Sequence, residues 1–351
     1  MGSEGLMLAE RIAEIEGVEA VVLGGPLARD EARPDSDVDL GIYYRPDHPP
    51  SLGELRRLAG ELDDRHLPDL VTDFGEWGPW INGGGWLRLE GRPVDWLYRD
   101  PDLVSQTIEE CRAGRAACHY QPGHPHGFHN HIYAGEVHYC CPLYDPLGRL
   151  AGLKVRLSEY PPPLKRTLVK RFLWEADFAL HTRRKPAKRG EVPYVGGCLF
   201  RCGACLMQAL FALNERYFVN EKGSVKTAGS FALCPDGFEK TVSDVLAEPG
   251  RDAAGLRTNV RRFERLVEAV RSLRLKSARF PNGKRNAAPL RLQRDALTER
   301  RDAFQPEIPG GFRYDGSGEK RPCLGIRIDA EHRPHQKRNG PGGPRLRAAR
   351  G

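Results

Sequence analysis

The chain has 351 residues, 40% of them hydrophobic and 8% aromatic, a composition that supports buried cores and excludes a fibrous chain. Its first residues mix acidic with apolar side chains, and no later stretch approaches the ~20 apolar residues of a membrane span, so we expect a cytoplasmic protein with neither signal peptide nor membrane segment. The net charge of +7 comes from the carboxyl-terminal end, because residues 276–351 hold 18 Lys+Arg against 8 Asp+Glu and leave residues 1–275 at a net −3.

The first predicted elements are a helix and two strands. Residues 6–16 have apolar positions at helical spacing, and residues 18–25 (VEAVVLGG) are typical of a short buried strand that ends in a glycine turn. After a short polar stretch, residues 37–44 (DVDLGIYY) form a second predicted strand. This alternation favours an α/β arrangement.

The next predicted elements extend the sheet. Residues 52–64 are amphipathic, and residues 86–100 contain two strand-like runs joined at Glu90-Gly91, a typical hairpin turn. We therefore expect a mixed-sheet α/β (α+β) domain over residues 1–150, in which residues 101–150 are a connecting region rich in His, Pro and Gly.

From about residue 160 the pattern changes to helical spacing. The predicted helices are residues 163–184, 194–217, 235–247 and 252–275. They predict a helical bundle domain over residues 151–275. Residues 276–351 are basic, with Pro and Gly throughout and few clustered apolar residues, so we expect a largely disordered tail.

Acidic residues precede and enter the second predicted strand. Asp37 and Asp39 project to the same side because side chains alternate along a strand, and two neighbouring carboxylates are stable together when a cation neutralises them. Mg²⁺ is held by one or two carboxylates together with nucleotide phosphate oxygens, so this pair is a candidate metal site. Asp35 follows Pro34 in the expected turn and is left out of the ligand set.

A third carboxylate and a phosphate-binding turn are also candidates. Asp95 is an acid inside the otherwise apolar run RPVDWLY, which is costly unless a cation or donor meets it. Gly24 and Gly25 lie where a strand enters a turn, so their backbone can approach phosphate oxygens, and Arg29 follows with a guanidinium suited to the same group. The alternatives without function are a solvated strand start for Asp37 and Asp39, an acid at a sheet edge for Asp95, and an ordinary turn for the two glycines.

These residues resemble a known family. Two glycines, a small turn, Arg, then Asp-x-Asp and an apolar strand, with a later third acid, look like the nucleotidyltransferase superfamily that includes kanamycin and lincosamide nucleotidyltransferases and DNA polymerase beta. The stretch VTDFGEWGPWINGGGWLRLEGRPVDWLYRD, the GHPHGF loop and YVGGCLFR…VNEKG resemble bacterial nucleotidyltransferase-domain proteins of unassigned substrate. The resemblance covers roughly residues 1–275.

The resemblance implies transfer of a nucleoside monophosphate from a nucleoside triphosphate, with ATP expected, to a hydroxyl acceptor, with Mg²⁺ as the cofactor and pyrophosphate as the product. By position it implies three catalytic and metal-binding acids, four nucleotide-binding residues and one residue lining the acceptor pocket. These are Asp37, Asp39 and Asp95; Gly24, Gly25, Arg29 and Lys222; and His124, respectively.

One position departs from the family pattern. Relatives usually have Ser after the second glycine, and here Pro26 supplies neither a hydroxyl nor a backbone N–H. The acceptor also stays open, because a small antibiotic-like molecule and an RNA or protein acceptor both fit the resemblance. A catalytically weakened module that only binds nucleotide is a further alternative, supported by Pro26.

Two other motifs have simpler interpretations. Cys198, Cys202 and Cys205 match an iron–sulfur spacing, but they fall in an apolar helical run where cysteines pack as small side chains. The six histidines of residues 119–141 match no regular zinc spacing, and their Pro and Gly neighbours predict a loop. Contact between the basic tail and nucleic acid is a further alternative.

Overall fold

The computed structural model describes residues 2–29, 31–279, 313–314 and 320–321. Met1–Gly283 form one compact unit, and Lys284–Gly351 form a second, in which β8 (Arg313–Tyr314) pairs antiparallel with β9 (Lys320–Arg321). Apart from these strands and residues 276–279, which end the last helix, the predicted disordered tail lies outside the described residues. The domain boundaries at 150 and 275 stay predictions.

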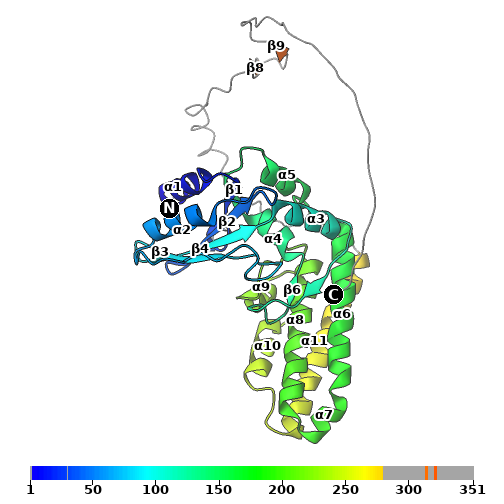
Figure 1. Ribbon diagram of the computed structural model, residues 1–351. Helices are drawn as coiled ribbons and strands as arrows, with labels where there is room; N and C mark the ends of the chain where they lie inside the picture. The colour runs from blue at the N-terminus through cyan, green and yellow to red at the C-terminus, as the bar shows by residue number, and fades with distance from the viewer. Residues whose placement is uncertain (1, 30, 280–312, 315–319, 322–351) are drawn as a thin grey trace, which may run out of the picture. The chain divides into compact units, whose positions relative to one another are not determined.

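A five-stranded mixed sheet forms the amino-terminal part of the first unit (Figure 1). Its strands, in spatial order, are β3 (Gly84–Leu89), β4 (Arg92–Arg99), β2 (Val38–Tyr44), β1 (Val18–Leu23) and β7 (Cys141–Tyr144). Only β2 and β4 run parallel to each other, and the other neighbours are antiparallel. The predicted mixed-sheet α+β fold is confirmed.

The alternation within β2 gives the sheet two different faces. Val38, Leu40 and Ile42 are buried in the core that also includes residues of α1 (Gly2–Ala13) and α2 (Leu52–Leu62). Tyr43 points to the opposite face and belongs to the core shared with the helical part of the chain. Asp39 shares the face of Tyr43, because residues two apart on a strand point the same way.

The β3–β4 hairpin forms as predicted. Glu90 and Gly91 both have positive φ, of 50° and 78°, which suits a two-residue turn that follows the twist of the strands. The Asp64 carboxylate accepts hydrogen bonds from both turn amides, at 2.9 and 2.8 Å. The hairpin thereby fixes where Asp95 falls along β4.

The region 101–150 contains more regular structure than the connecting region we predicted. It holds helices and strands, namely α3 (Pro101–Arg112), β5 (Cys118–His119), β6 (Phe128–His129), α4 (Ile132–Tyr139), β7 and α5 (Arg149–Arg156). Asp100 caps α3 by accepting from two backbone N–H groups, with Pro101 in the first turn. Asp100 followed by Pro101 is a helix start signal, which the prediction of a connecting region from its His, Pro and Gly content did not take into account.

The remaining helices form the predicted helical region. Four of them match predicted segments, α6 (Pro162–Thr182), α8 (Val192–Leu213), α10 (Phe238–Ala247) and α11 (Ala253–Arg279), while the short α7 (Arg184–Arg189) and α9 (Ser224–Gly229) were not predicted. Helices α6, α8 and α11 pack side by side (Figure 1). Cys202 and Cys205 are buried on α8 and pack in the core, as the simpler interpretation of that motif predicts.

Helix α8 corrects one expectation. Among the described residues it is the one helix that is long and apolar enough to cross a membrane by length and composition, so the statement that no stretch approaches a span is wrong. However, 72% of its most apolar window is buried inside the protein, as in a core helix. Arg201 in its middle bonds Glu175 at 2.6 Å.

Candidate active site

The structure brings two of the predicted acids onto neighbouring strands. Asp39 on β2 is the register partner of Asp95 on β4. Parallel partners point to the same face of a sheet, about 4.8 Å apart along the hydrogen-bonding direction, so these two carboxylates share one face. Both are half-buried, whereas Asp37 is exposed and lies just before β2, which begins at Val38 and not at residue 37 as predicted.

The three carboxylates influence one another electrostatically. Burial, together with the negative charges of Asp95 and Asp37, raises the pKa of Asp39 to about 6. Burial, followed by the charge of Asp37, also raises the pKa of Asp95. The site therefore concentrates negative charge that a cation would relieve.

The glycine turn lies directly against Asp39. Gly25 has φ of +60°, and a Cβ at this position would overlap the Asp39 carboxylate. The Gly24 N–H donates to the Asp39 backbone carbonyl oxygen at 2.8 Å, so Gly24 fastens the turn to β2. A phosphate contact from this pair would therefore come from the Gly25 amide.

A lysine from the helical region acts electrostatically on the acids. The Lys222 ammonium, just before α9, lowers the pKa of both Asp39 and Asp95, against the effect of burial. Its neighbour Glu221 lies 3.4 Å from His124 Nδ1, and both side chains are mostly buried. His124 is thus joined to the segment that carries Lys222, although no contact of its own with the acids is present in the described part of the chain.

A comparison with protein families identifies the fold around this site. The family model described as a nucleotidyltransferase domain matches residues 7–79, which include the glycine turn, Asp37 and Asp39. Residues 7–79 are therefore similar to a nucleotidyltransferase domain. Asp95, His124 and Lys222 lie outside the matched stretch, so their roles stay predictions that rest on geometry and resemblance.

Other comparisons add little to the nucleotidyltransferase assignment. No curated protein matches the chain. Among solved structures, a nucleotidyltransferase-like protein from Exiguobacterium sibiricum 255-15 is 12% identical, with a TM-score of 0.38, over 84% of this chain and 85% of that chain.

Arg29, which lies within the matched stretch, already contacts neighbouring side chains. It ends the short helix η1 (Leu27–Arg29), its Nε lies 3.3 Å from Glu31, and its guanidinium carbon is 5.9 Å from the centroid of the Tyr139 ring. A phosphate contact would have to compete with these neighbours, and this role stays a prediction.

Sequence reasoning missed one acid beside the site. Glu136 on α4 raises the pKa of Asp39, and it accepts from buried Arg99 at 2.9 and 3.0 Å. The Arg99 side chain is 4% exposed and also lies 5.7 Å from the centroid of the Tyr133 ring. An arginine at the end of an apolar strand was the available signal, since such a charge requires a buried partner.

The residues present fit a magnesium ion that is completed by substrate. Among the described residues, no group of three or more His, Cys, Asp or Glu side chains could hold a metal ion by itself. Mg²⁺ does not need such a cage, because it takes one or two carboxylates and substrate phosphates. Asp39 and Asp95 supply carboxylate oxygens on one face, and the absence of a Cβ at Gly25 leaves the space that the Asp39 carboxylate occupies.

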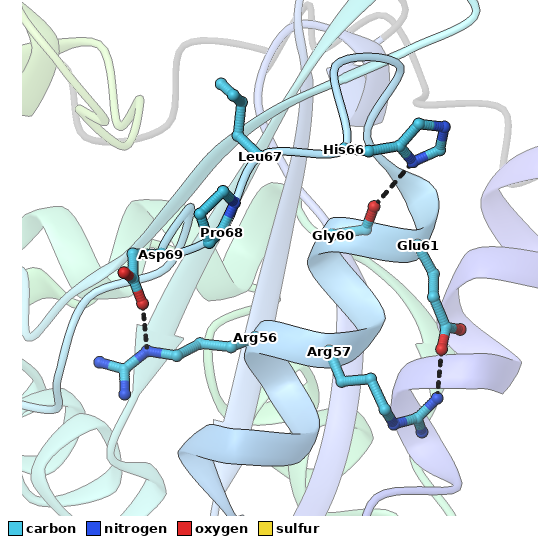
Figure 2. A pocket seen from close by; sticks show the side chains of 8 residues that line it. All are labelled: Arg56, Arg57, Gly60, Glu61, His66, Leu67, Pro68 and Asp69. Atoms are coloured by element: carbon cyan, nitrogen blue, oxygen red, sulfur yellow. Dashed lines mark hydrogen bonds and ion pairs between the residues drawn. The ribbon is translucent and has the colours of Figure 1, made fainter.

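A surface hollow elsewhere on the domain does not belong to this site. It has a volume of ≈ 630 Å³ and is lined by α2 and the loop after it, including Arg56, Arg57 and His66 (Figure 2). None of the predicted site residues lines it. Its charged groups pair with each other, as in the 2.5 Å contact between Arg57 and Glu61, so we assign it no role in the chemistry.

Proposed function

We propose that the protein transfers a nucleoside monophosphate from a nucleoside triphosphate, with ATP expected, to the hydroxyl group of a small acceptor and releases pyrophosphate. The observation that supports this proposal most strongly is the pairing of Asp39 with Asp95 on adjacent parallel strands, with Gly25 against the Asp39 carboxylate. This arrangement brings two acids and a glycine turn together, and the turn and Asp39 lie within the stretch that matches a nucleotidyltransferase domain.

The proposed reaction divides the work among these residues. The acceptor oxygen attacks the α-phosphorus, and its proton passes to the Asp95 carboxylate. The new oxygen–phosphorus bond forms as the bond from the α-phosphorus to the bridging oxygen breaks, and that oxygen leaves with pyrophosphate. Lys222 and the Gly25 amide would hold the departing phosphates through charge and hydrogen bonding.

Of the three predicted ligands, Asp39 and Asp95 would hold Mg²⁺ together with the substrate, with exposed Asp37 beside them, and the ion when bound would neutralise phosphate charge as a Lewis acid. Burial of Asp39 and Asp95 strengthens this role, because a half-buried carboxylate pays a desolvation cost that a bound cation reduces. His124 would line the acceptor pocket, the role that the resemblance implies for it.

Replacement of Asp39 tests the proposal. Asp39→Ala should lower pyrophosphate release by roughly 1,000-fold, since loss of a metal ligand removes several kcal/mol of transition-state stabilisation. The screen should offer ATP, GTP, CTP and UTP, each with a set of hydroxylated small molecules and with total RNA. Thermal unfolding followed by circular dichroism checks that the fold is intact.

Asp35→Ala is the matched control. Asp35 is an exposed acid four residues before Asp39 and is not in the proposed ligand set, so its loss should leave turnover close to that of the wild type. Unchanged activity in Asp39→Ala would remove the proposed mechanism.

A second candidate function is a nucleotide-binding module without turnover. Pro26 supports it, because the turn lacks the N–H and hydroxyl that this position supplies in the family it resembles. Calorimetry with ATP and Mg²⁺ separates the candidates: a sensor binds nucleotide without releasing pyrophosphate. An RNA acceptor is the alternative for the transfer reaction, and the total RNA arm of the screen tests it.

A further inference from the structure

An exposed tryptophan lies beside Asp95 on the outer strand of the sheet. Trp86 on β3 is the register partner of Asp95 on β4. Directly opposed residues of antiparallel strands point to the same face, so the indole shares the face of the acids. Trp86 is 61% exposed, although tryptophan is a residue that proteins usually bury to a large extent.

A second tryptophan stacks on the first. The ring centroids of Trp77 and Trp86 are 4.5 Å apart, with an interplanar angle of 27°. The Trp77 carbonyl oxygen accepts from Gln121 Nε2 at 2.6 Å, and Gln121 is 5% exposed. This hydrogen bond fixes the backbone of Trp77, on which the Trp86 indole stacks, while Trp86 remains 61% exposed.

The order of the strands gives this pair a position in the reaction. Going outward across the sheet, the glycine turn follows β1, Asp39 lies on β2, Asp95 on β4 and Trp86 on the edge strand β3. The phosphate-binding turn and Trp86 are thus on opposite sides of the two acids. If the triphosphate binds at the turn, the acceptor would bind on the Trp86 side of the acids.

We propose that the Trp77–Trp86 pair is the acceptor subsite, where the planar base of a nucleoside stacks on the indole while the reacting hydroxyl lies near Asp95. A single exposed indole is ordinary on a protein surface, but packing does not explain an exposed indole that is in register with Asp95, the candidate general base. The inference rests on the proposed function, because it assumes that Asp95 takes the proton of the acceptor hydroxyl.

The chemistry of the indole selects the ligand class. Indole faces bind planar π systems by offset stacking, and base-on-aromatic stacking tolerates any base because every base has a π face. The shared chemistry is a planar base attached to a hydroxylated sugar. It can come from a free nucleoside or from the 3′ end of an RNA strand, and the test distinguishes the two.

The test compares Trp86 variants of the full chain by pyrophosphate release at saturating triphosphate. The acceptors are adenosine, cytidine, a short RNA with a free 3′-hydroxyl, the same RNA with a 3′-phosphate, and kanamycin as a hydroxylated compound without an aromatic ring. Trp86→Ala should raise the KM for nucleosides or for the free-ended RNA about tenfold. The KM for the triphosphate should not change, and Trp86→Phe should restore most of the acceptor affinity.

Trp174→Ala is the matched control. Trp174 on α6 is 65% exposed and stacks on Phe178 with centroids 5.3 Å apart, but it has no register partner among the acids. Its loss should leave the KM for the acceptor unchanged. An equal effect in Trp86→Ala and Trp174→Ala, or use of kanamycin alone with no dependence on Trp86, overturns the subsite.

Binding separates this inference from the proposed function. Titration of each nucleoside and RNA against tryptophan fluorescence reports the subsite without turnover. Binding that is lost in Trp86→Ala, in a protein that releases no pyrophosphate, keeps the subsite and rejects the transfer reaction. If no nucleoside or RNA binds the wild type, the inference is wrong, whatever the activity with other acceptors.

Discussion

Gly25 has a positive φ of +60°, which other residues adopt only at a cost in free energy. It also lies directly against the Asp39 carboxylate. Gly25→Ala should lose stability, because an Ala with φ of +60° costs about 1–2 kcal/mol. It should also lose roughly 100-fold or more in turnover, since the new methyl displaces a carboxylate whose position matters to within about 1 Å. Urea unfolding and pyrophosphate release measure the two effects.

Gly148→Ala separates backbone strain from the clash. Gly148 has φ of +65°, and a Cβ there would meet no atom within 4 Å. This control should lose similar stability and keep its activity. If Gly25→Ala keeps its activity as well, then the contact with Asp39 is not important for the chemistry.

The residue types of the site could be predicted from the sequence only where the signal is local. Asp39 and Asp95 stand out because each is an acid within an apolar strand, and the structure puts them in register. Glu136 and Glu221 could not be found this way, because their partners Arg99 and His124 are distant in sequence. Glu221 lies in the polar segment NEKG, where no local pattern marks a glutamate as mostly buried.

At the scale of elements, the contact between His124 and Glu221 joins the loop before β6 to the segment before α9. Glu221→Ala should raise the KM for the triphosphate about tenfold through the loss of Lys222 placement, with a smaller effect on kcat. Lys222→Gln should change the same constant. Steady-state kinetics with the triphosphate as the varied substrate measure this split.

Lys226→Gln is the control for the lysine charge. Lys226 is exposed one turn further along the chain, on α9, so its loss should leave the KM unchanged. A drop in kcat with an unchanged KM in Glu221→Ala would show that the contact does not position the nucleotide-binding lysine.

The ion pair between β4 and α4 is a second connection between elements. Glu136→Ala should destabilise the fold by about 3–5 kcal/mol, because it leaves the Arg99 guanidinium buried without its carboxylate partner. Urea unfolding measures the loss. Glu248→Ala, which breaks an exposed pair with Arg251, should cost less than about 1 kcal/mol. Equal losses would mean that burial does not increase the contribution of the Arg99–Glu136 pair to the free energy of unfolding.

Elements were predictable where the apolar pattern is continuous. Helices α2, α6, α8 and α11 follow their predicted segments, since helical spacing needs only local sequence. Strand β7 could not be predicted, because four residues carry little pattern and its pairing with β1 joins positions more than 100 residues apart. Long-range pairing of this kind depends on the whole fold rather than on propensity.

At the scale of the whole molecule, the change from strand to helical patterns predicted the order of the two regions correctly. It could not predict that they share a core, in which Val22 and Tyr43 of the sheet belong with Phe172 of α6 and Leu206 of α8. Periodicity reports the type of an element but not the surface against which it packs. The boundary at residue 150 remains a prediction for this reason.

Buried histidines in this shared core make global stability depend on pH. Burial lowers the pKa of His129 to about 2 and that of His131 to about 4, so both are neutral in the folded protein. In the unfolded chain they take up protons near pH 6.5, so the unfolded state binds more protons below that pH. Stability should therefore fall as the pH drops from about 6.5 toward 4, by up to about 1.4 kcal/mol per pH unit for each histidine.

The dependence can be assigned to one side chain by replacement. His131 bonds Gln208 at 3.0 Å, and His131→Gln retains a polar group that does not titrate, so its stability should fall less steeply with acid than that of the wild type. Comparing variants removes the opposite contribution of Asp39, whose raised pKa of about 6 favours the folded state as the pH falls. His181→Gln, an exposed position on α6, should keep the wild-type slope. Urea unfolding between about pH 7 and 5 measures all three proteins, and an unchanged slope in His131→Gln would show that this histidine does not make stability acid-sensitive.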